Sequence, residues 1–181
     1  MPRIPQIQER SDVPEDMAHH FDAIASSRGR VSGPFAMLLN SPEIAGRAAH
    51  LGSYIRFESV LSADIRELAI ITAAREFDCH YEWSAHVVLA RDSGVREDAI
   101  QAVANRGALD GLTDDEALVI GYGREMLGSK RVSDNTFGKA EARFGVKGVT
   151  ELTATMGYYA MLACALNTFE VEPAPDAERL P

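Results

Sequence analysis

A short segment, Cys79 to His86, carries most of the side chains in this chain that could do chemistry. Cys79, Glu82 and His86 are spaced at i, i+3 and i+7, so a helix that begins after Asp78 places them on one face. We expect the short carboxylate of Asp78 to cap that helix. A thiol, a carboxylate and an imidazole would then form one stripe, and the apolar residues around it predict that the stripe faces a pocket. Such a stripe could support proton transfer or thiol chemistry.

A second acid lies upstream, in a stretch where nearly every other side chain is apolar. A carboxylate in the position of Glu67 needs a partner or must bind a proton. One interpretation is a proton relay beside the helix that carries Glu82 and His86. The other is a salt bridge to a nearby arginine, Arg66 or Arg75, without a role in function. The sequence leaves both interpretations open.

The helices that must position these side chains can be read from capping residues and apolar periodicity. We expect helices over about residues 14–28, 42–57, 63–77, 79–92, 95–105, 114–126, 133–144 and 149–169. The last of these is apolar on nearly every side, Cys164 included, so it should be central or lie between subunits. No alternating strand pattern of convincing length occurs. The sequence therefore predicts an all-α fold, a compact helical domain that forms oligomers.

Composition limits the classes of function. The chain has 181 residues, a formal net charge of −9 and no block rich in Lys or Arg, which argues against binding to nucleic acid or anionic membranes. Its longest apolar run is too short to span a bilayer. We expect a flexible N-terminal arm over residues 1–13, one helical domain over residues 14–170 and a loose tail over residues 171–181. Two distant cysteines and the lack of a secretory signal predict a cytoplasmic protein.

Several segments, taken in order, resemble the carboxymuconolactone decarboxylase family, which includes the alkylhydroperoxidase D-like proteins. The segments that carry the resemblance are Gly33-Pro34, Leu38-Leu39, Ser41-Pro42, Arg66-Glu67-Leu68, Tyr81-Glu82-Trp83 with His86, Ala90 with Gly94, Gly157-Tyr158-Tyr159 and Leu166-Asn167. The resemblance implies an all-helical subunit that associates through apolar helices as a trimer or hexamer.

The chain departs from the peroxidase branch of that family at one position. That branch has Cys-x-x-Cys with a histidine four residues later and a glutamate twelve residues before the first cysteine. Glu67, Cys79 and His86 match three of these positions, but Glu82 replaces the second cysteine. Peroxide reduction in that branch needs the cysteine pair. The resemblance is therefore to members with Tyr-Glu-Trp, for which the family name implies proton transfer on a small carboxylated lactone.

Our main hypothesis is a cofactor-free enzyme, a decarboxylase-like lyase that acts on a small organic acid or lactone. Glu82 and His86, spaced at i and i+4, would be the acid/base pair, and Glu82 would orient the imidazole. Glu67 would be a second acid or a relay. Four further side chains are candidates for binding the substrate: Arg56, Arg66, Tyr81 and Trp83.

Other functions were weighed against this hypothesis. Cys79 at a helix N-terminus could act as a thiol peroxidase, with peroxiredoxin activity, if an external thiol resolved it. A metal site formed by His80, Glu82 and His86 would need three ligands on one helical turn, and this strain leads us to expect no metal. A purely structural oligomer would have a filled apolar space where we expect the pocket.

Overall fold

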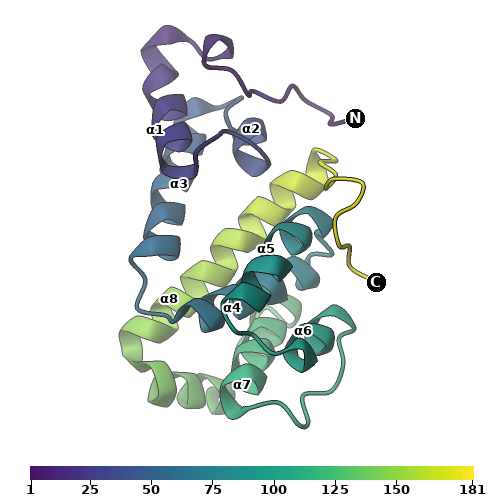
Figure 1. The fold of residues 1–181 in the computed structure, drawn as a ribbon. Coiled ribbons are helices and arrows are strands. Elements are labelled where there is room, and N and C mark those ends of the chain that lie inside the picture. The colour runs from purple at the N-terminus through teal and green to yellow at the C-terminus, as the bar shows by residue number, and fades with distance from the viewer. The chain divides into compact units, whose positions relative to one another are not determined.

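The computed structural model describes residues 1–181, and all of its regular structure is helical, as predicted. None of its helices is both long enough and apolar enough to cross a membrane. The α-helices in Figure 1 are α1 (Ala18–Arg28), α2 (Pro34–Leu38), α3 (Pro42–Phe57), α4 (Ala63–Glu76), α5 (His80–Asp92), α6 (Glu97–Ala104), α7 (Asp114–Gly123) and α8 (Asp134–Thr168). Two short 3₁₀ helices, η1 (Arg10–Asp12) and η2 (Glu15–Met17), precede α1, and a short π-helix, η3 (Arg124–Gly128), follows α7.

The contacts divide the chain into two compact units. Unit 1 comprises residues 1–58 and 164–172, and unit 2 comprises residues 59–163 and 173–181. Within unit 1, α3 packs against α1 and α2. The division into arm, domain and tail that we drew from the sequence stays a prediction.

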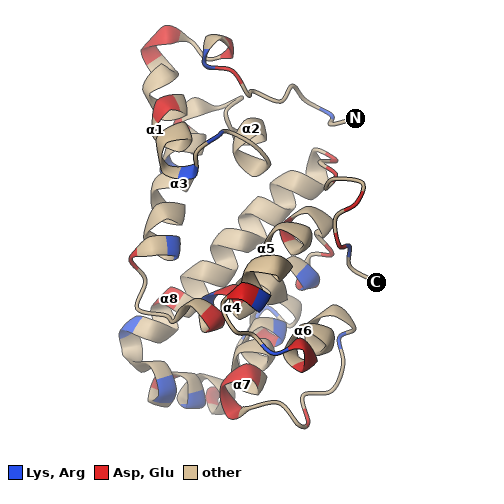
Figure 2. Cartoon of the chain, viewed as in Figure 1, with Lys and Arg blue, Asp and Glu red and all other residues tan.

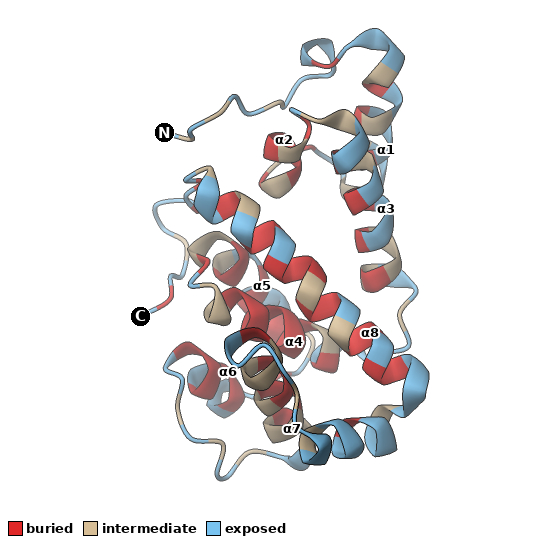
Figure 3. Cartoon of the chain, turned by 180° about the vertical axis from the view of Figure 1, so that it is seen from behind, coloured by how far each residue is buried: buried red, intermediate tan, exposed pale blue.

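Helix α4 is the centre of unit 2. It packs against α5, α6, α7 and η3, which cover it from several sides. Its interior side chains are almost all apolar, so only a helix with neighbours on several faces can bury them. Figure 3 shows this burial along α4 and the adjacent part of α5. Glu67 and Thr72 are the polar members of the buried set of α4.

A close approach between helices occurs at Gly123, the last residue of α7. A Cβ atom there would lie 2.6 Å from Thr72 Cγ2 of α4 and 3.1 Å from Met156 Cε of α8. Atoms do not approach so closely without displacement. Glycine therefore allows α7 to pack against both α4 and α8 at one point.

The N-terminus of α7 forms the predicted capping box. Thr113 Oγ1 accepts a hydrogen bond from Glu116 N–H, and the Glu116 carboxylate accepts one from Thr113 N–H. Arg96 donates to the same carboxylate at 2.6 Å, and this guanidinium is the main cause that lowers the pKa of Glu116 to about 2. Asp114, Asp115 and Glu116 occupy the first turn of α7, which is red in the ribbon of Figure 2, and the helix dipole favours acidic residues there.

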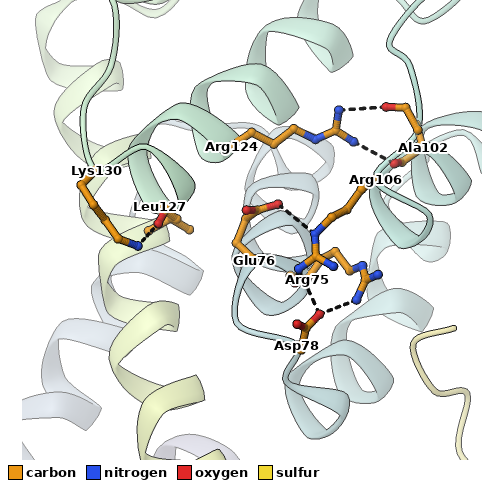
Figure 4. Close-up of polar contacts among 9 residues, drawn as sticks. Arg75, Glu76, Asp78, Ala102, Arg106, Arg124, Leu127 and Lys130 are labelled. Carbon is orange, nitrogen blue, oxygen red and sulfur yellow. Dashed lines mark hydrogen bonds and ion pairs between the residues drawn. The ribbon is translucent and has the colours of Figure 1, made fainter.

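The turn between α4 and α5 differs from our expectation. Asp78 does not cap α5, because its backbone is left-handed (φ 47°) and Cys79 occupies the N-cap position. Arg106 donates to the Asp78 carboxylate at 3.0 Å and to the backbone carbonyl of Arg75 at 2.9 Å, and Arg75 also pairs with Asp78 (Figure 4). The two arginines hold the carboxylate in this turn, so it is not available as the helix cap.

Arg124 closes the C-terminal end of α6. Its guanidinium donates to the carbonyls of Gly107 at 2.8 Å and Ala102 at 2.9 Å, as Figure 4 shows for this region. Burial lowers the pKa of Arg124 from its ordinary value. The side chain thus donates to the Gly107 carbonyl and shares the Ala102 carbonyl with Gly107 N–H, which donates to it at 2.9 Å.

Helix α8 is bent at Gly145, where φ is 71° and ψ is 171°. This residue ends the first helical segment, as its position in the sequence predicted. Met161 and Cys164 of the second segment are exposed in the single chain, and our expectation that this helix is central or lies between subunits stays a prediction. Apolar composition alone does not determine which side chains of a helix are covered by neighbours.

Candidate active site

The candidate site lies within unit 2 and is built from α4 and α5, which pack against each other. Glu67 of α4 and Glu82 and His86 of α5 are all buried, at 5%, 3% and 7% exposure. Buried ionisable groups are stable only with partners, so their contacts define what they can do.

The shortest contact joins the two helices. His86 Nδ1 lies 2.7 Å from Glu67 Oε2. An ionised carboxylate can only accept hydrogen bonds. When Glu67 is ionised, Nδ1 therefore carries a proton and is the donor of the hydrogen bond to Glu67. In a neutral ring the lone pair is then on Nε2. Glu67 therefore orients the imidazole and selects its tautomer.

Glu82 lies on the other side of the same ring. Its Oε2 is 3.6 Å from His86 Nε2, too far for a direct hydrogen bond. This changes the roles expected from the i, i+4 spacing, since the partner that orients His86 is Glu67 on the neighbouring helix. Glu82 instead faces the nitrogen that can exchange a proton with a third group.

Arg66 places a positive charge next to the cluster. Its Nε lies 3.8 Å from Glu67 Oε1, and the side chain is 17% exposed. The buried Nε has no hydrogen-bond acceptor. Glu67 thus has His86 at one carboxylate oxygen and Arg66 near the other.

An aromatic side chain that we did not single out from the sequence completes the surroundings of His86. The ring of Tyr159, from α8, lies edge-on to the imidazole, with 4.9 Å between centroids and 81° between planes. Tyr158 in turn lies edge-on to Tyr159 at 5.3 Å. The sequence signals were a pair of aromatic residues in an apolar helix, which is ordinary core composition, and the segment Gly157-Tyr158-Tyr159 of the family resemblance.

The remaining predicted residues lie in different surroundings. Cys79 is fully buried at the N-cap of α5, and Trp83 is 1% exposed with no hydrogen-bond acceptor for its Nε1. Tyr81 is half-buried. Arg56 belongs to unit 1, where its guanidinium lies over the ring of Phe57 at 5.4 Å. Whether these four side chains bind or act on a substrate stays a prediction.

An open groove of about 640 Å³ lies elsewhere in unit 2, between α7 and the first segment of α8. None of the residues discussed above lines it, and its Arg143 and Asp115 already pair with each other at 2.7 Å. The buried Glu67–His86 pair is the better candidate for chemistry, because its ionisable groups face one another out of water. Since these groups are covered, a substrate can reach His86 only if covering side chains move.

Residues 42–123 match the model of the carboxymuconolactone decarboxylase family, a segment that includes Glu67, Cys79, Glu82 and His86. No curated protein matches the chain. Tyr159 lies outside the matched segment. Residues 42–123 of this chain are therefore similar to the carboxymuconolactone decarboxylase family.

Proposed function

We propose that this chain is a cofactor-free enzyme that transfers protons on a small carboxylated lactone or related organic acid, in a decarboxylation or an associated isomerisation. The observation that carries the proposal is the buried His86 ring, held by Glu67 at Nδ1 and faced by Glu82 at Nε2. The match of residues 42–123 to the model of the carboxymuconolactone decarboxylase family supports the same class of chemistry.

In a decarboxylation, the bond between the carboxylate and its carbon breaks, CO₂ leaves, and the electron pair stays on that carbon. Conjugation with the lactone carbonyl delocalises the pair. In this step the ring starts doubly protonated, His86 Nε2 gives its proton to the carbon and becomes the lone-pair nitrogen, and Nε2 regains a proton from solvent through Glu82. One proton is consumed for each CO₂ released. In an isomerisation, the same pair removes a proton from one carbon and returns it to another.

Glu67 stabilises the protonated ring in this scheme, because a carboxylate that accepts from Nδ1 favours the imidazolium that forms during transfer. Arg66 is the proposed partner of the substrate carboxylate. Its guanidinium is mostly buried beside Glu67, and its Nε has no acceptor within the protein. Trp83 Nε1 is a second buried donor without an acceptor and could bind another substrate oxygen.

The test is an assay of CO₂ release from carboxymuconolactone and from a panel of small lactone carboxylates. We expect H86N and E82Q to lower kcat by about 10²- to 10⁴-fold, the usual contribution of general acids and bases. C79S is the matched control, since Cys79 is a buried residue of the same helix end and serine is a good N-cap. Its activity should stay close to that of the wild type.

The competing hypothesis is thiol chemistry at Cys79, and the same variants distinguish it. It predicts consumption of hydrogen peroxide in the presence of a dithiol, lost in C79S and retained in E82Q. That pattern, combined with the absence of turnover on every lactone, would overturn the proposal. Helix content by circular dichroism verifies that each variant is folded.

We also propose a homo-oligomer, a trimer or hexamer, as the resemblance implied. Val88 of α5 is 51% exposed and Leu89 is 36% exposed, which places adjacent apolar side chains in contact with water in a single chain. A second copy of the chain could cover them. Light scattering at micromolar concentration should give a mass above 19.7 kDa, the mass of one chain, and a monomer would contradict the proposal.

A further inference from the structure

We propose that Tyr159, on α8, is a positioning residue of the site, which holds the His86 ring so that Nε2 stays directed at Glu82. The Tyr159 and His86 rings lie 4.9 Å apart between centroids, with 81° between their planes, which is a favourable edge-to-face geometry. Tyr159 is 3% exposed, so the contact is shielded from water. The residue lies beyond the segment that matches the family model.

An imidazole held at one nitrogen can still turn about the Cβ–Cγ bond. The Glu67 hydrogen bond restrains Nδ1, but a hydrogen bond tolerates tens of degrees of misalignment. A ring packed edge-on against the imidazole restricts this rotation by contact. With both restraints, Nε2 keeps its direction toward Glu82, 3.6 Å away. Loss of Tyr159 should therefore affect the orientation of His86 while leaving the Glu67 carboxylate in place.

Two features of α8 hold Tyr159 itself. Tyr158 packs edge-on against the Tyr159 ring at 5.3 Å. One turn earlier, Met156 lies at the close approach with Gly123, where Thr72 of α4 also lies. This crossing sets the distance between α8 and the helix that carries Glu67. The position of the tyrosine ring thus depends on packing that extends over three helices.

The experiment compares Y159F and Y159L with Y122L as the matched control. Tyr122 is also a buried tyrosine of unit 2, at 3% exposure, and its hydroxyl is hydrogen-bonded to Thr153 at 2.7 Å. Nitrogen-15 NMR of the histidine rings, with His86 identified by its loss in H86N, reports the tautomer directly. We expect the wild type, Y159F and Y122L to show one tautomer with Nδ1 protonated. In Y159L the signals should average toward a mixture.

Turnover gives a second measurement, which rests on the proposed function. Misplacement of a catalytic group by about 1 Å typically slows a reaction by roughly 10²-fold, so kcat of Y159L should fall about 10- to 100-fold with a smaller change in KM. Y159F should restore activity, because it keeps the ring. If Y159L is unfolded, Y159M, which keeps apolar bulk without a ring, replaces it in both measurements.

The outcomes separate the two proposals. An unchanged His86 signal in folded Y159L overturns the positioning role, and so does an equal change in Y122L, which would indicate general loss of packing. A shifted tautomer in Y159L supports that role even if no lactone is turned over. In that case the proposed reaction fails while the positioning of His86 by Tyr159 stands.

Discussion

Gly123 offers the sharpest test of how unit 2 holds the site together. Substituting alanine adds one methyl group, which would meet Thr72 Cγ2 at 2.6 Å and Met156 Cε at 3.1 Å. The methionine end can move aside, but the threonine methyl is attached to a buried helix position. The clash with Thr72 should therefore force α4 and α7 apart.

The size of the effect follows from two opposing terms. Overpacking of a core by one methyl group costs about 1–3 kcal/mol. Alanine also gains roughly 1 kcal/mol over glycine from helix propensity. The variant G121A, in the same helix, has the same gain in helix propensity without the clash, because a Cβ at Gly121 meets only Leu109 Cδ1 at an ordinary 3.8 Å. Comparing G123A with G121A therefore cancels the propensity gain. G123A should be less stable than G121A by about 1–3 kcal/mol, or roughly 2–12 °C in Tm for a chain of this size.

The assay is urea denaturation followed by the fluorescence of Trp83, the single tryptophan, which is buried in unit 2. A second substitution, T72S, removes the clashing methyl while keeping a hydroxyl that can donate to Leu68 O, as Thr72 does at 2.7 Å. It should recover most of the stability lost in G123A. Equal midpoints for G123A and G121A, or no recovery with T72S, would refute the packing argument.

Charged side chains elsewhere in unit 2 give three more predictions. R124M should lower the free energy of unfolding by about 1 kcal/mol, because the Gly107 carbonyl loses its Arg124 donor while the Ala102 carbonyl keeps only Gly107 N–H, and an unchanged urea midpoint would contradict this. The pKa of Glu116 lies at about 2 instead of 4.5, so its pairing with Arg96 stabilises the fold fully above about pH 4.5 and is lost as the pH falls toward 2. The urea midpoint of the wild type should therefore fall over this range more steeply than that of E116Q. E82C restores Cys-x-x-Cys with Cys79 and should confer dithiol-dependent peroxide reduction; a folded variant that forms the new disulfide without this activity would show that the peroxidase geometry is not shared.

Much of the helical architecture could be predicted from local sequence. Thr113 marks a helix start through hydrogen bonds within one turn, and Pro42 marks another through its fixed φ in the first turn, so the neighbouring residues contain the necessary information. The start of α5 was placed one residue early, because arginines on two other segments determine the conformation of Asp78. Such a turn depends on tertiary contacts, which periodicity does not report.

The candidate site was predicted as a set of residues but not as an arrangement. The i, i+4 spacing indicated that Glu82 and His86 share a helix face, and both are buried there. The spacing could not show that Glu67, nineteen positions from His86, makes the shorter contact. Tyr159 is still farther along the chain, and its aromatic ring in an apolar helix had an ordinary interpretation as core. Partners on different helices require knowledge of how those helices pack.

The buried charges explain why the site should respond to mutation as one unit. Arg66 Nε lies 3.8 Å from Glu67, and His86 lies 2.7 Å from Glu67 and 3.6 Å from Glu82, so the four groups form one contiguous buried cluster. Transfer of a proton between His86 and a substrate changes the buried charge by one, and the change is shared by groups that contact one another. Removal of any single member leaves its partner buried without compensation, which typically costs 3–5 kcal/mol. The loss measured for one substitution therefore contains the penalty of its neighbours and cannot be assigned to that residue alone.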